Sequence, residues 1–401
     1  MAPDLAGLRF VPAADVYKNG TLAGQLSRTP QGAIQFSYSP AYAEGGGTAV
    51  ASTLPVGTAT VAHVGLPPFF AGLLPEGHRL TVLRNAVKTS PDDELTVLLA
   101  VGADVPGDVQ IVPAGQAPEE PPVLAEIDGA ALDFSALAVA LDLHGLPGVQ
   151  DKVSASMLTA PLAARQGRYI LKLDPPQHRH LVLNESLHLR AAAEMRLPVA
   201  AHSVHHDAAG RPGLLVRRFD RAPDEDGGWR RLPLEDGAQL LGVLPASKYA
   251  VDTEQLIVAA ADACAARPVA LRNLYMQFLF AWLTGNGDLH AKNISVLWDR
   301  PGKGSVAPIY DIPCTLLYDD ETMALPIGGV TRKLKASHWK SLAADIGLPE
   351  KAARSAAALA ARAARTADLG ALPFSGTRLH RAQRELRTRH EELERVQPLP
   401  G

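Results

Sequence analysis

Apolar and polar residues alternate near the start of the chain in a pattern that predicts a β-meander. The alternation runs from Asp15 to about Tyr42 and is broken at Asn19-Gly20 and Gln31-Gly32, pairs that favour tight turns. Helical spacing replaces it between about 67 and 83, where an aromatic pair and a prolyl turn precede a helix. This part of the chain therefore predicts a small domain of strands and short helices.

A proline-rich stretch from 113 to 122 ends this pattern and is the best candidate for a linker. Beyond it, 169–173 reads as a strand in which Lys172 is flanked by aliphatic residues. A lysine in such a strand must either reach water or pair with an anion. Taken on its own, this segment favours the interpretation that Lys172 protects an edge strand from pairing with another chain. A helix is expected from Asn184, as its N-cap, to about 195. Glu185 could pair with Lys172, although the helix dipole alone would explain a glutamate there.

The C-terminal half of the chain predicts mostly helices around one hairpin. A buried strand ends at about 216 in a turn with several arginines, which the simplest interpretation leaves in solvent. Apolar residues at helical spacing then lead to a polar loop from Gly285 to Asn293, and 294–298 and 306–310 read as the two strands of a hairpin. The runs 351–367 and 378–396 are helical by propensity.

Composition narrows the class of protein. The 401 residues are 47% hydrophobic, which suits a chain of two or three lobes, and a net charge of -3 provides no overall basic field for nucleic acid. Cys264 and Cys314 lie in apolar surroundings and are expected to be reduced core thiols. The start of the chain lacks a targeting pattern, and no apolar run is long enough to span a membrane. We therefore expect a cytoplasmic protein without membrane contact.

The polar loop carries the candidate chemistry. Asp288 and Asn293 are separated as the catalytic aspartate and the metal-binding asparagine are in the kinase motif H-R-D-x-x-x-x-N, and Asp311 follows after the hairpin. Magnesium prefers carboxylate, amide and phosphate oxygens, so these three side chains suit a magnesium-dependent phosphoryl-transfer site. Asp, Asn, Gly and His are also ordinary turn residues, but the order of helix, polar loop, hairpin and aspartate is that of a kinase C-lobe.

Six segments, in order, resemble the HipA-like serine/threonine kinases, which are the toxins of bacterial toxin–antitoxin pairs. The similarity covers about 15 to 333 and comprises Asp15 to Gly20 with Leu22-Ala23-Gly24, Pro68 to Gly77 (P-F-F-x-x-L-L-P-E-G), Gly148 to Lys152 (G-x-Q-x-K), Val216 to Arg221 (V-x-R-F-D-R), Asp288 to Asn293 (D-x-H-A-K-N) and Tyr310-Asp311. The resemblance implies an α+β, bilobal protein-kinase-like fold with a β-rich N-terminal subdomain and a mostly helical C-lobe. The expected boundaries are 1–112, 123–221 and 222–401.

The resemblance also assigns roles to individual residues. Asp288 would be the catalytic base, and Asn293 and Asp311 would bind Mg²⁺. Lys172 would contact the phosphates of ATP, the loop from Pro147 to Lys152 would cover them, and Arg217 to Phe219 would face the adenine. The full set of expected ATP-binding residues is Pro147, Gly148, Val149, Gln150, Asp151, Lys152, Lys172, Arg217, Arg218, Phe219, His290, Lys292 and Tyr310.

The implied activity is phosphorylation of a translation-related protein such as an aminoacyl-tRNA synthetase. The implied partner is an antitoxin with a helix-turn-helix fold, through which alone the chain would reach DNA. Two departures from the family pattern stand out: Gly145 replaces the serine whose autophosphorylation switches the kinase off, and Arg217 replaces an acidic hinge residue. The alternatives are a small-molecule kinase, which the segment at Phe69 to Gly77 disfavours, and a nucleotide-binding pseudokinase that acts as a corepressor, which an intact Asp288 disfavours.

Overall fold

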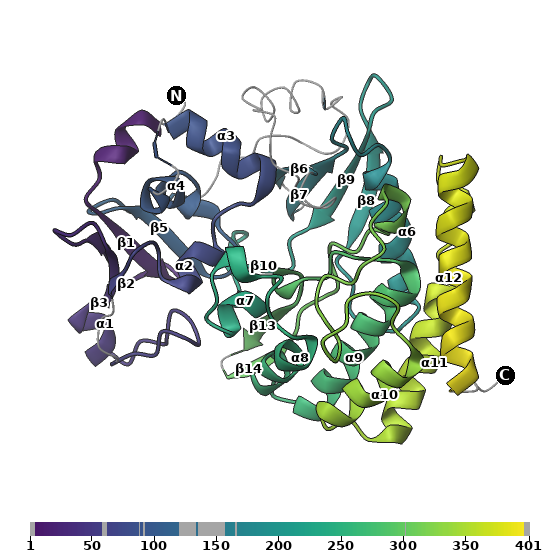
Figure 1. Cartoon of the computed structure of the whole chain (residues 1–401). Coiled ribbons are helices and arrows are strands. Elements are labelled where there is room, and N and C mark those ends of the chain that lie inside the picture. The colour runs from purple at the N-terminus through teal and green to yellow at the C-terminus, as the bar shows by residue number, and fades with distance from the viewer. Residues whose placement is uncertain are drawn as a thin grey trace.

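The chain forms an N-terminal domain, a four-stranded sheet and a largely helical C-terminal part, which follow one another along the sequence in this computed structural model (Figure 1). The structure describes residues 5–57, 62–87, 89–90, 93–119, 134, 157–164, 167–300 and 302–396. None of the helices within these ranges is both long enough and apolar enough to traverse a bilayer.

The N-terminal domain is built on the predicted meander. Its sheet has the order β4-β3-β2-β1-β5, and the Asn19-Gly20 turn has positive φ angles of 47° and 74°, as a tight hairpin requires. Phe69 and Phe70 lie in its core, where the Phe70 ring is 5.2 Å from that of Phe36, so the aromatic pair packs inside the domain. The elements are β1 (Ala13–Lys18), β2 (Thr21–Arg28), β3 (Ile34–Tyr38), α1 (Pro40–Glu44), β4 (Ala62–His63), α2 (Pro68–Gly72), α3 (Gly77–Val87), α4 (Glu94–Val101) and β5 (Val109–Pro113).

The second sheet is antiparallel with the order β6-β7-β9-β8, and helix α6 packs against β8 and β9. The strand that carries Lys172 is β7, which lies between β6 and β9. Protection of an edge strand is therefore the wrong explanation for this lysine. The elements are β6 (Leu158–Ala164), β7 (Gly167–Leu173), α6 (Leu181–Ala193), β8 (His202–His206) and β9 (Pro212–Arg217).

Helix α6 begins before the predicted N-cap. The Asp174 carboxylate accepts hydrogen bonds from the backbone N–H groups of His180 and Val182, at 2.7 and 2.8 Å, and so satisfies donors of the first turn. Asn184 therefore lies inside the helix and is fully buried. Its amide bonds both the N–H and the carbonyl of Cys314, each at 2.9 Å, and this joins α6 to the C-terminal part.

The C-terminal part is organised around helix α9, whose residues from 270 to 284 are almost all buried. Alanines of α11 pack on α9, α12 covers the outside, and the thiols of Cys264 and Cys314 are buried and free, as predicted. The elements are β10 (Arg221–Pro223), β11 (Trp229–Arg231), β12 (Leu234–Asp236), α7 (Gly237–Leu240), α8 (Thr253–Asp262), α9 (Arg267–Thr284), β13 (Ser295–Arg300), β14 (Lys303–Val306), α10 (Ala336–Asp345), α11 (Glu350–Ala364) and α12 (Gly376–Val396).

The second strand of the hairpin is shorter and earlier than predicted. Strand β14 ends at Val306, and Ile309 instead forms a parallel bridge to Val199. Pro308 lacks the N–H that a continuing ladder would need, so the chain leaves β13 before it reaches Tyr310. Asp311 consequently lies in the loop after β14, near Lys172 of β7, and not at the end of the hairpin.

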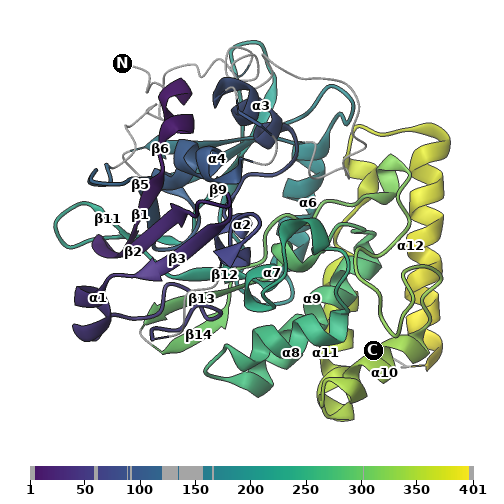
Figure 2. The ribbon, with the colours of Figure 1, turned by 60° about the vertical axis from the view of Figure 1, so that its left-hand side comes forward.

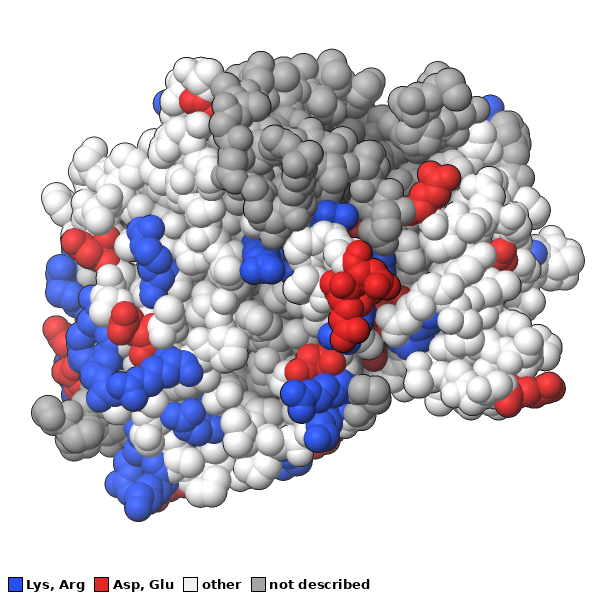
Figure 3. Space-filling view, turned by 180° about the vertical axis from the view of Figure 1, so that it is seen from behind, with Lys and Arg blue, Asp and Glu red and all other residues white. Residues whose placement is uncertain are grey.

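Charge is mixed over the back of the molecule (Figure 3), where lysine and arginine gather mainly on the side of the C-terminal helices. Both signs of charge are present on this face, in keeping with the small net charge of -3.

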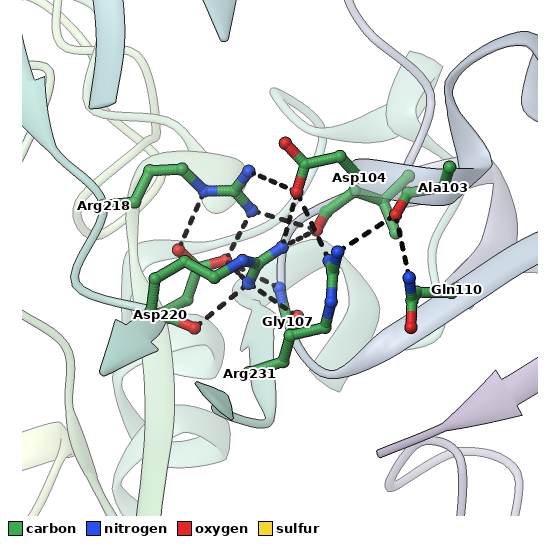
Figure 4. A network of polar contacts seen from close by, with 9 residues as sticks. Ala103, Asp104, Gly107, Gln110, Arg218, Asp220 and Arg231 are labelled. Atoms are coloured by element: carbon green, nitrogen blue, oxygen red, sulfur yellow. Dashed lines mark hydrogen bonds and ion pairs between the residues drawn. The ribbon is translucent and has the colours of Figure 1, made fainter. Parts of the chain in front are cut away.

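A buried ion-pair network fastens the N-terminal domain to the rest of the chain (Figure 4). Asp104 Oδ1 accepts from the guanidinium groups of Arg218, Arg221 and Arg231 at 2.8, 2.9 and 3.3 Å. Asp220 pairs with Arg218 and Arg221, both at 2.8 Å, and also accepts from the backbone N–H of Gly107. The arginines expected in solvent after β9 are thus mostly buried, and Arg217 alone of Arg217, Arg218 and Arg221 is exposed.

We predict that Asp104→Asn lowers the free energy of unfolding by about 3 kcal/mol at neutral pH, because it leaves buried guanidinium groups without their carboxylate. Burial alone would raise the pKa of Asp104, but the three arginines outweigh it and lower that pKa. The stability that Asp104 contributes is therefore present above the unfolded pKa and is lost as the pH falls below about 4. Denaturant titrations across this range measure the difference between variant and wild type.

The control is Asp262→Asn, which removes an exposed ion pair with Arg267 and is expected to cost less than about 1 kcal/mol. Equal losses in the two variants would show that the Asp104 network does not hold the domains together.

Candidate active site

Lys172 connects three elements at the centre of the candidate site. Its ammonium lies 2.8 and 2.9 Å from the two carboxylate oxygens of Glu185 on α6, and 3.0 Å from Oδ1 of Asp311. The predicted pairing of Lys172 with Glu185 is therefore confirmed. The Glu185 carboxylate is buried, whereas the Asp311 side chain is 21% exposed. The strand, the helix and the loop after β14 are held together by this one cation.

The electrostatics of this group follow from burial and opposite charge. Burial lowers the pKa of Lys172, but Asp311 and Glu185 outweigh it and raise that pKa, so the lysine is charged at physiological pH. Burial raises the pKa of Glu185, and Lys172 opposes this effect. Glu185 is thus a carboxylate whose charge depends on its lysine partner.

The polar loop is shaped by its own backbone and amide groups. Gly285 ends α9 in a left-handed conformation, with φ of 72°, and a Cβ there would lie 2.4 Å from Cδ1 of Leu316. The Asn293 side-chain N–H donates to the carbonyl of Asp288 at 2.9 Å, and the Asp288 N–H donates to the Asn286 side chain at 2.7 Å. These bonds bring the two ends of the D-x-x-x-x-N segment together. Because the side-chain N–H of Asn293 is used, its amide oxygen is the atom that can bind a cation.

Asp288 is fully buried and receives a hydrogen bond that the sequence did not reveal. The Tyr249 hydroxyl donates to Oδ1 of Asp288 at 2.9 Å, and the Tyr249 ring meets the His290 ring edge-on, with centroids 5.0 Å apart. Burial raises the pKa of Tyr249, and Asp288, Glu76 and Asp311 raise it further in that order. Asp288 and Asp311 are therefore both within electrostatic reach of the Tyr249 hydroxyl, and Tyr310, next to Asp311, bonds the catalytic loop at the carbonyl of Lys292.

Tyr310 and Phe219 form an aromatic pair next to Asp311. Their ring centroids are 5.6 Å apart. The Tyr310 hydroxyl points away from the loop of Asp311, since it donates to the carbonyl of Lys292 and bonds Ser295, both at 2.7 Å. Asp311 itself has a positive φ of 55°, a conformation that few non-glycine residues adopt. The part of Tyr310 that is available to contact a ligand is therefore its ring and not its hydroxyl.

Two expected nucleotide-binding side chains have other partners in the structure. The Lys292 ammonium lies 2.5 Å from Asp236 and 2.7 Å from the carbonyl of Gly72 in the N-terminal domain. The Arg218 guanidinium belongs to the buried network with Asp104 and Asp220. Both side chains are thus held by protein partners here, and their roles in nucleotide binding stay predictions. For Arg218 the backbone is the part that remains to face adenine, and a contact from Lys292 to a nucleotide would require its ion pair to break.

The expected phosphate loop, from Pro147 to Lys152, lies outside the described residues, as does Gly145. Of the other expected nucleotide-binding positions, Lys172 lies at the centre of the site and Arg217 is exposed at the end of β9, while His290 is buried against Tyr249.

The donor set fits magnesium only in part. Asp311 offers a partly exposed carboxylate and Asn293 an amide oxygen, both ligands that magnesium accepts. Within the part of the chain that the structure describes, no three His, Cys, Asp or Glu side chains are grouped as a metal centre would need. A cation on Asn293 and Asp311 would therefore need further ligands, and nucleotide phosphates commonly provide them.

Comparison with known proteins identifies relatives over most of the chain. Residues 14–112 match the HipA N-terminal domain, and residues 144–367 match the HipA-like C-terminal domain. A protein of Sinorhizobium fredii named "Putative kinase Y4mE" is 31% identical over 368 residues, which cover 84% of this chain and 87% of that protein. The serine/threonine-protein kinase toxin HipA of Shewanella oneidensis is 28% identical over 305 residues, 68% of each chain.

A solved structure has the same fold. It is a complex of HipA, HipB and operator DNA from the toxin–antitoxin system of Shewanella oneidensis, and its match has a TM-score of 0.77 at 21% identity, covering 95% of this chain and 97% of that one. The expected fold class, α+β and bilobal with a kinase-like architecture, is thereby confirmed.

We predict that Lys172→Met lowers the free energy of unfolding by about 3 kcal/mol at pH 7, because it leaves Glu185 buried without its cation. Burial raises the pKa of Glu185, so the carboxylate can escape this penalty by taking up a proton. The loss is therefore full above the folded pKa of Glu185 and shrinks as the pH falls towards the unfolded value of about 4.3. Denaturant titrations at pH 7 and pH 5 measure it, with exposed Lys303→Met as the control. A loss that grew on acidification would contradict the assignment.

Proposed function

The chain belongs to the HipA family, and we propose that it is an ATP- and magnesium-dependent protein serine/threonine kinase that serves as the toxin of a toxin–antitoxin pair. The observation that carries the proposal is the grouping of Lys172, Glu185 and Asp311 beside a loop that presents Asp288 and Asn293. In protein kinases a strand lysine paired with a helix glutamate, a catalytic-loop aspartate and asparagine and a further metal-binding aspartate have these positions.

The proposed roles follow from the position of each group. The Lys172 ammonium is charged and lies between Glu185 and Asp311. It can therefore neutralise phosphate oxygens of a nucleotide bound at Asp311, while Glu185 keeps it in place. Asn293 and Asp311 would hold magnesium, which when bound neutralises charge on the transferring phosphoryl group. Positioning and charge neutralisation account for most of the catalysis in such enzymes.

Asp288 is the proposed acceptor of the proton from the substrate hydroxyl. Its carboxylate is oriented by the Tyr249 hydroxyl, and its backbone carbonyl is tied to Asn293, so the base and the metal ligand move together. The aromatic pair of Phe219 and Tyr310, with the backbone after β9, supports adenine binding at the hinge.

The biological partners are proposed by analogy with the relatives. The complex of Shewanella HipA with HipB and operator DNA supports an antitoxin partner with a helix-turn-helix fold, through which this chain would reach DNA. The small net charge of -3 favours indirect over direct DNA contact. We propose a cytoplasmic, translation-related protein as the substrate, an aminoacyl-tRNA synthetase being the candidate to test first.

The first functional prediction concerns Asp288. Asp288→Ala is expected to reduce phosphoryl transfer from labelled ATP to a purified synthetase by at least about 100-fold, because the hydroxyl loses its proton acceptor. The matched control is Asp299→Ala, an exposed aspartate on β13, which should behave as wild type. Transfer that survives in the Asp288→Ala protein would refute the catalytic assignment. ATP consumption that needs no protein acceptor would instead indicate a small-molecule kinase, and wild type that binds but does not consume ATP would indicate a pseudokinase.

The second functional prediction concerns Asp311. Asp311→Asn removes a charged ligand, so the magnesium concentration for half-maximal activity should rise at least about tenfold, equivalent to about 1.4 kcal/mol of binding. Magnesium titrations at saturating ATP measure this value for the variant, for wild type and for Asp299→Asn. An unchanged magnesium requirement would remove Asp311 from the proposed metal site.

A further inference from the structure

The N-terminal domain reaches the catalytic loop through one short segment, from Phe69 to Glu76. Helix α2 lies beside α7 in both ribbon views (Figures 1 and 2), and the side-chain N–H of Gln239 on α7 donates to the carbonyl of Phe69 at 2.9 Å. At Gly72 the approach is so close that a Cβ would lie 2.8 Å from Cγ of Gln239. The segment is therefore packed directly on the C-terminal part and is not tethered to it at a distance.

Two contacts from this segment end on the catalytic loop or on the residue next to it. The carbonyl of Gly72 accepts from the Lys292 ammonium at 2.7 Å, and Lys292 lies within the loop between Asp288 and Asn293. The Glu76 carboxylate forms an ion pair with Lys248, which is buried and adjacent to Tyr249. A domain far away in sequence thus contacts the loop directly at Lys292 and, through Glu76, pairs with Lys248, whose own carbonyl bonds the loop at Ala291.

A continuous chain of contacts leads from Glu76 to Asp288. The Lys248 ammonium lies 5.1 Å from the centroid of the Tyr249 ring, and the Lys248 carbonyl accepts from the backbone N–H of Ala291 at 3.3 Å. The Tyr249 hydroxyl then donates to Asp288 at 2.9 Å. Each link is a direct contact, so Glu76 is joined to the Asp288 carboxylate through Lys248 and Tyr249.

Electrostatics agree with this geometry. Burial raises the pKa of Tyr249 and of Tyr310, and Glu76 raises both further, after nearer carboxylates. Burial lowers the pKa of Lys292, but Asp236 and then Glu76 outweigh it and raise that pKa. The negative charge of Glu76 is therefore felt at three residues that surround the candidate site, although Glu76 belongs to another domain.

We propose that Glu76 is a positioning residue, through which docking of the N-terminal domain holds the catalytic loop in its working conformation. The inference rests on the proposed kinase function for its catalytic consequence, but the placement of the loop does not depend on that function. The role differs from that of the Asp104 network, whose ion pairs join the same two parts of the chain through Arg218, Arg221 and Arg231.

The test compares Glu76→Gln with Arg231→Gln in the full-length chain. Both variants remove one ion pair between the N-terminal domain and the rest of the chain, but only the first pair leads to Asp288. We expect Glu76→Gln to lower kcat about 10- to 100-fold with KM for ATP unchanged, because a misplaced catalytic group costs rate and not nucleotide affinity. Hydrogen exchange of the peptide covering 285–293 should also accelerate. Arg231→Gln should alter neither measurement.

Lys248→Gln and the double variant with Glu76→Gln complete a cycle. If the two residues act as one unit, the double variant loses no more rate than either single variant, whereas losses that multiply would show independent roles and overturn the proposal. Glu76→Asp, which keeps the charge but shortens the reach, provides a second variant with the same expectation should Glu76→Gln fail to fold.

The two readouts separate this inference from the proposed function. Suppose that wild type transfers no phosphoryl group, and that loop exchange is faster in Glu76→Gln but not in Arg231→Gln. This outcome would support the positioning role of Glu76 and refute the proposed kinase activity. An active wild type in which Glu76→Gln and Arg231→Gln behave alike in kcat and in loop exchange would overturn the positioning role and leave the kinase intact.

Discussion

The charged ammonium of Lys172 is the constraint on which the candidate site depends. A cation this deeply placed must be paired, and its partners are supplied by α6 and by the loop after β14. Because Glu185 is buried and Asp311 is partly exposed, the lysine is bound firmly on one side and faces the site on the other. The same contact that stabilises the fold therefore prepares a positive charge for an anionic ligand.

A second set of charges makes the N-terminal domain part of the same unit. Asp104 forms ion pairs with three arginines from the segment after β9, and Asp220 pairs with Arg218 in the same network. The V-x-R-F-D-R segment, read from sequence as a hinge that faces adenine, thus uses Arg218, Asp220 and Arg221 to fasten two domains. Gly72 contacts the catalytic loop at Lys292, and Glu76 pairs with Lys248 beside Tyr249, so the N-terminal domain also contributes to the surroundings of the candidate site.

Local pattern explains which features could be predicted. The meander followed from alternation and from a turn at Asn19-Gly20, and α9 followed from helical spacing that ends at Gly285, because each signal lies within a few neighbouring residues. The pairing of Lys172 with Glu185 could be proposed because a buried lysine needs an anion. In each case the residues that decide the structure are close in sequence or are chemically constrained.

The features that sequence missed depend on partners far away along the chain. Arg218 meets Asp104 across 114 positions and Lys292 meets Gly72 across 220, and no local pattern records such a contact. Tyr249 lies in a loop without periodicity, so nothing in the sequence marked it as the partner of Asp288. The start of α6 was misplaced because its cap, Asp174, stands several residues before the helix.

A crystal structure of the chain with a non-hydrolysable ATP analogue and Mn²⁺ tests the proposed site most directly, because the anomalous signal locates the metal independently of the protein. We expect an anomalous peak within coordination distance of the Asn293 amide oxygen and the Asp311 carboxylate, with Lys172 against the phosphates and Asp288 facing the terminal phosphate. A metal bound elsewhere, or a nucleotide bound away from Asp288 and Asp311, would contradict the proposed site.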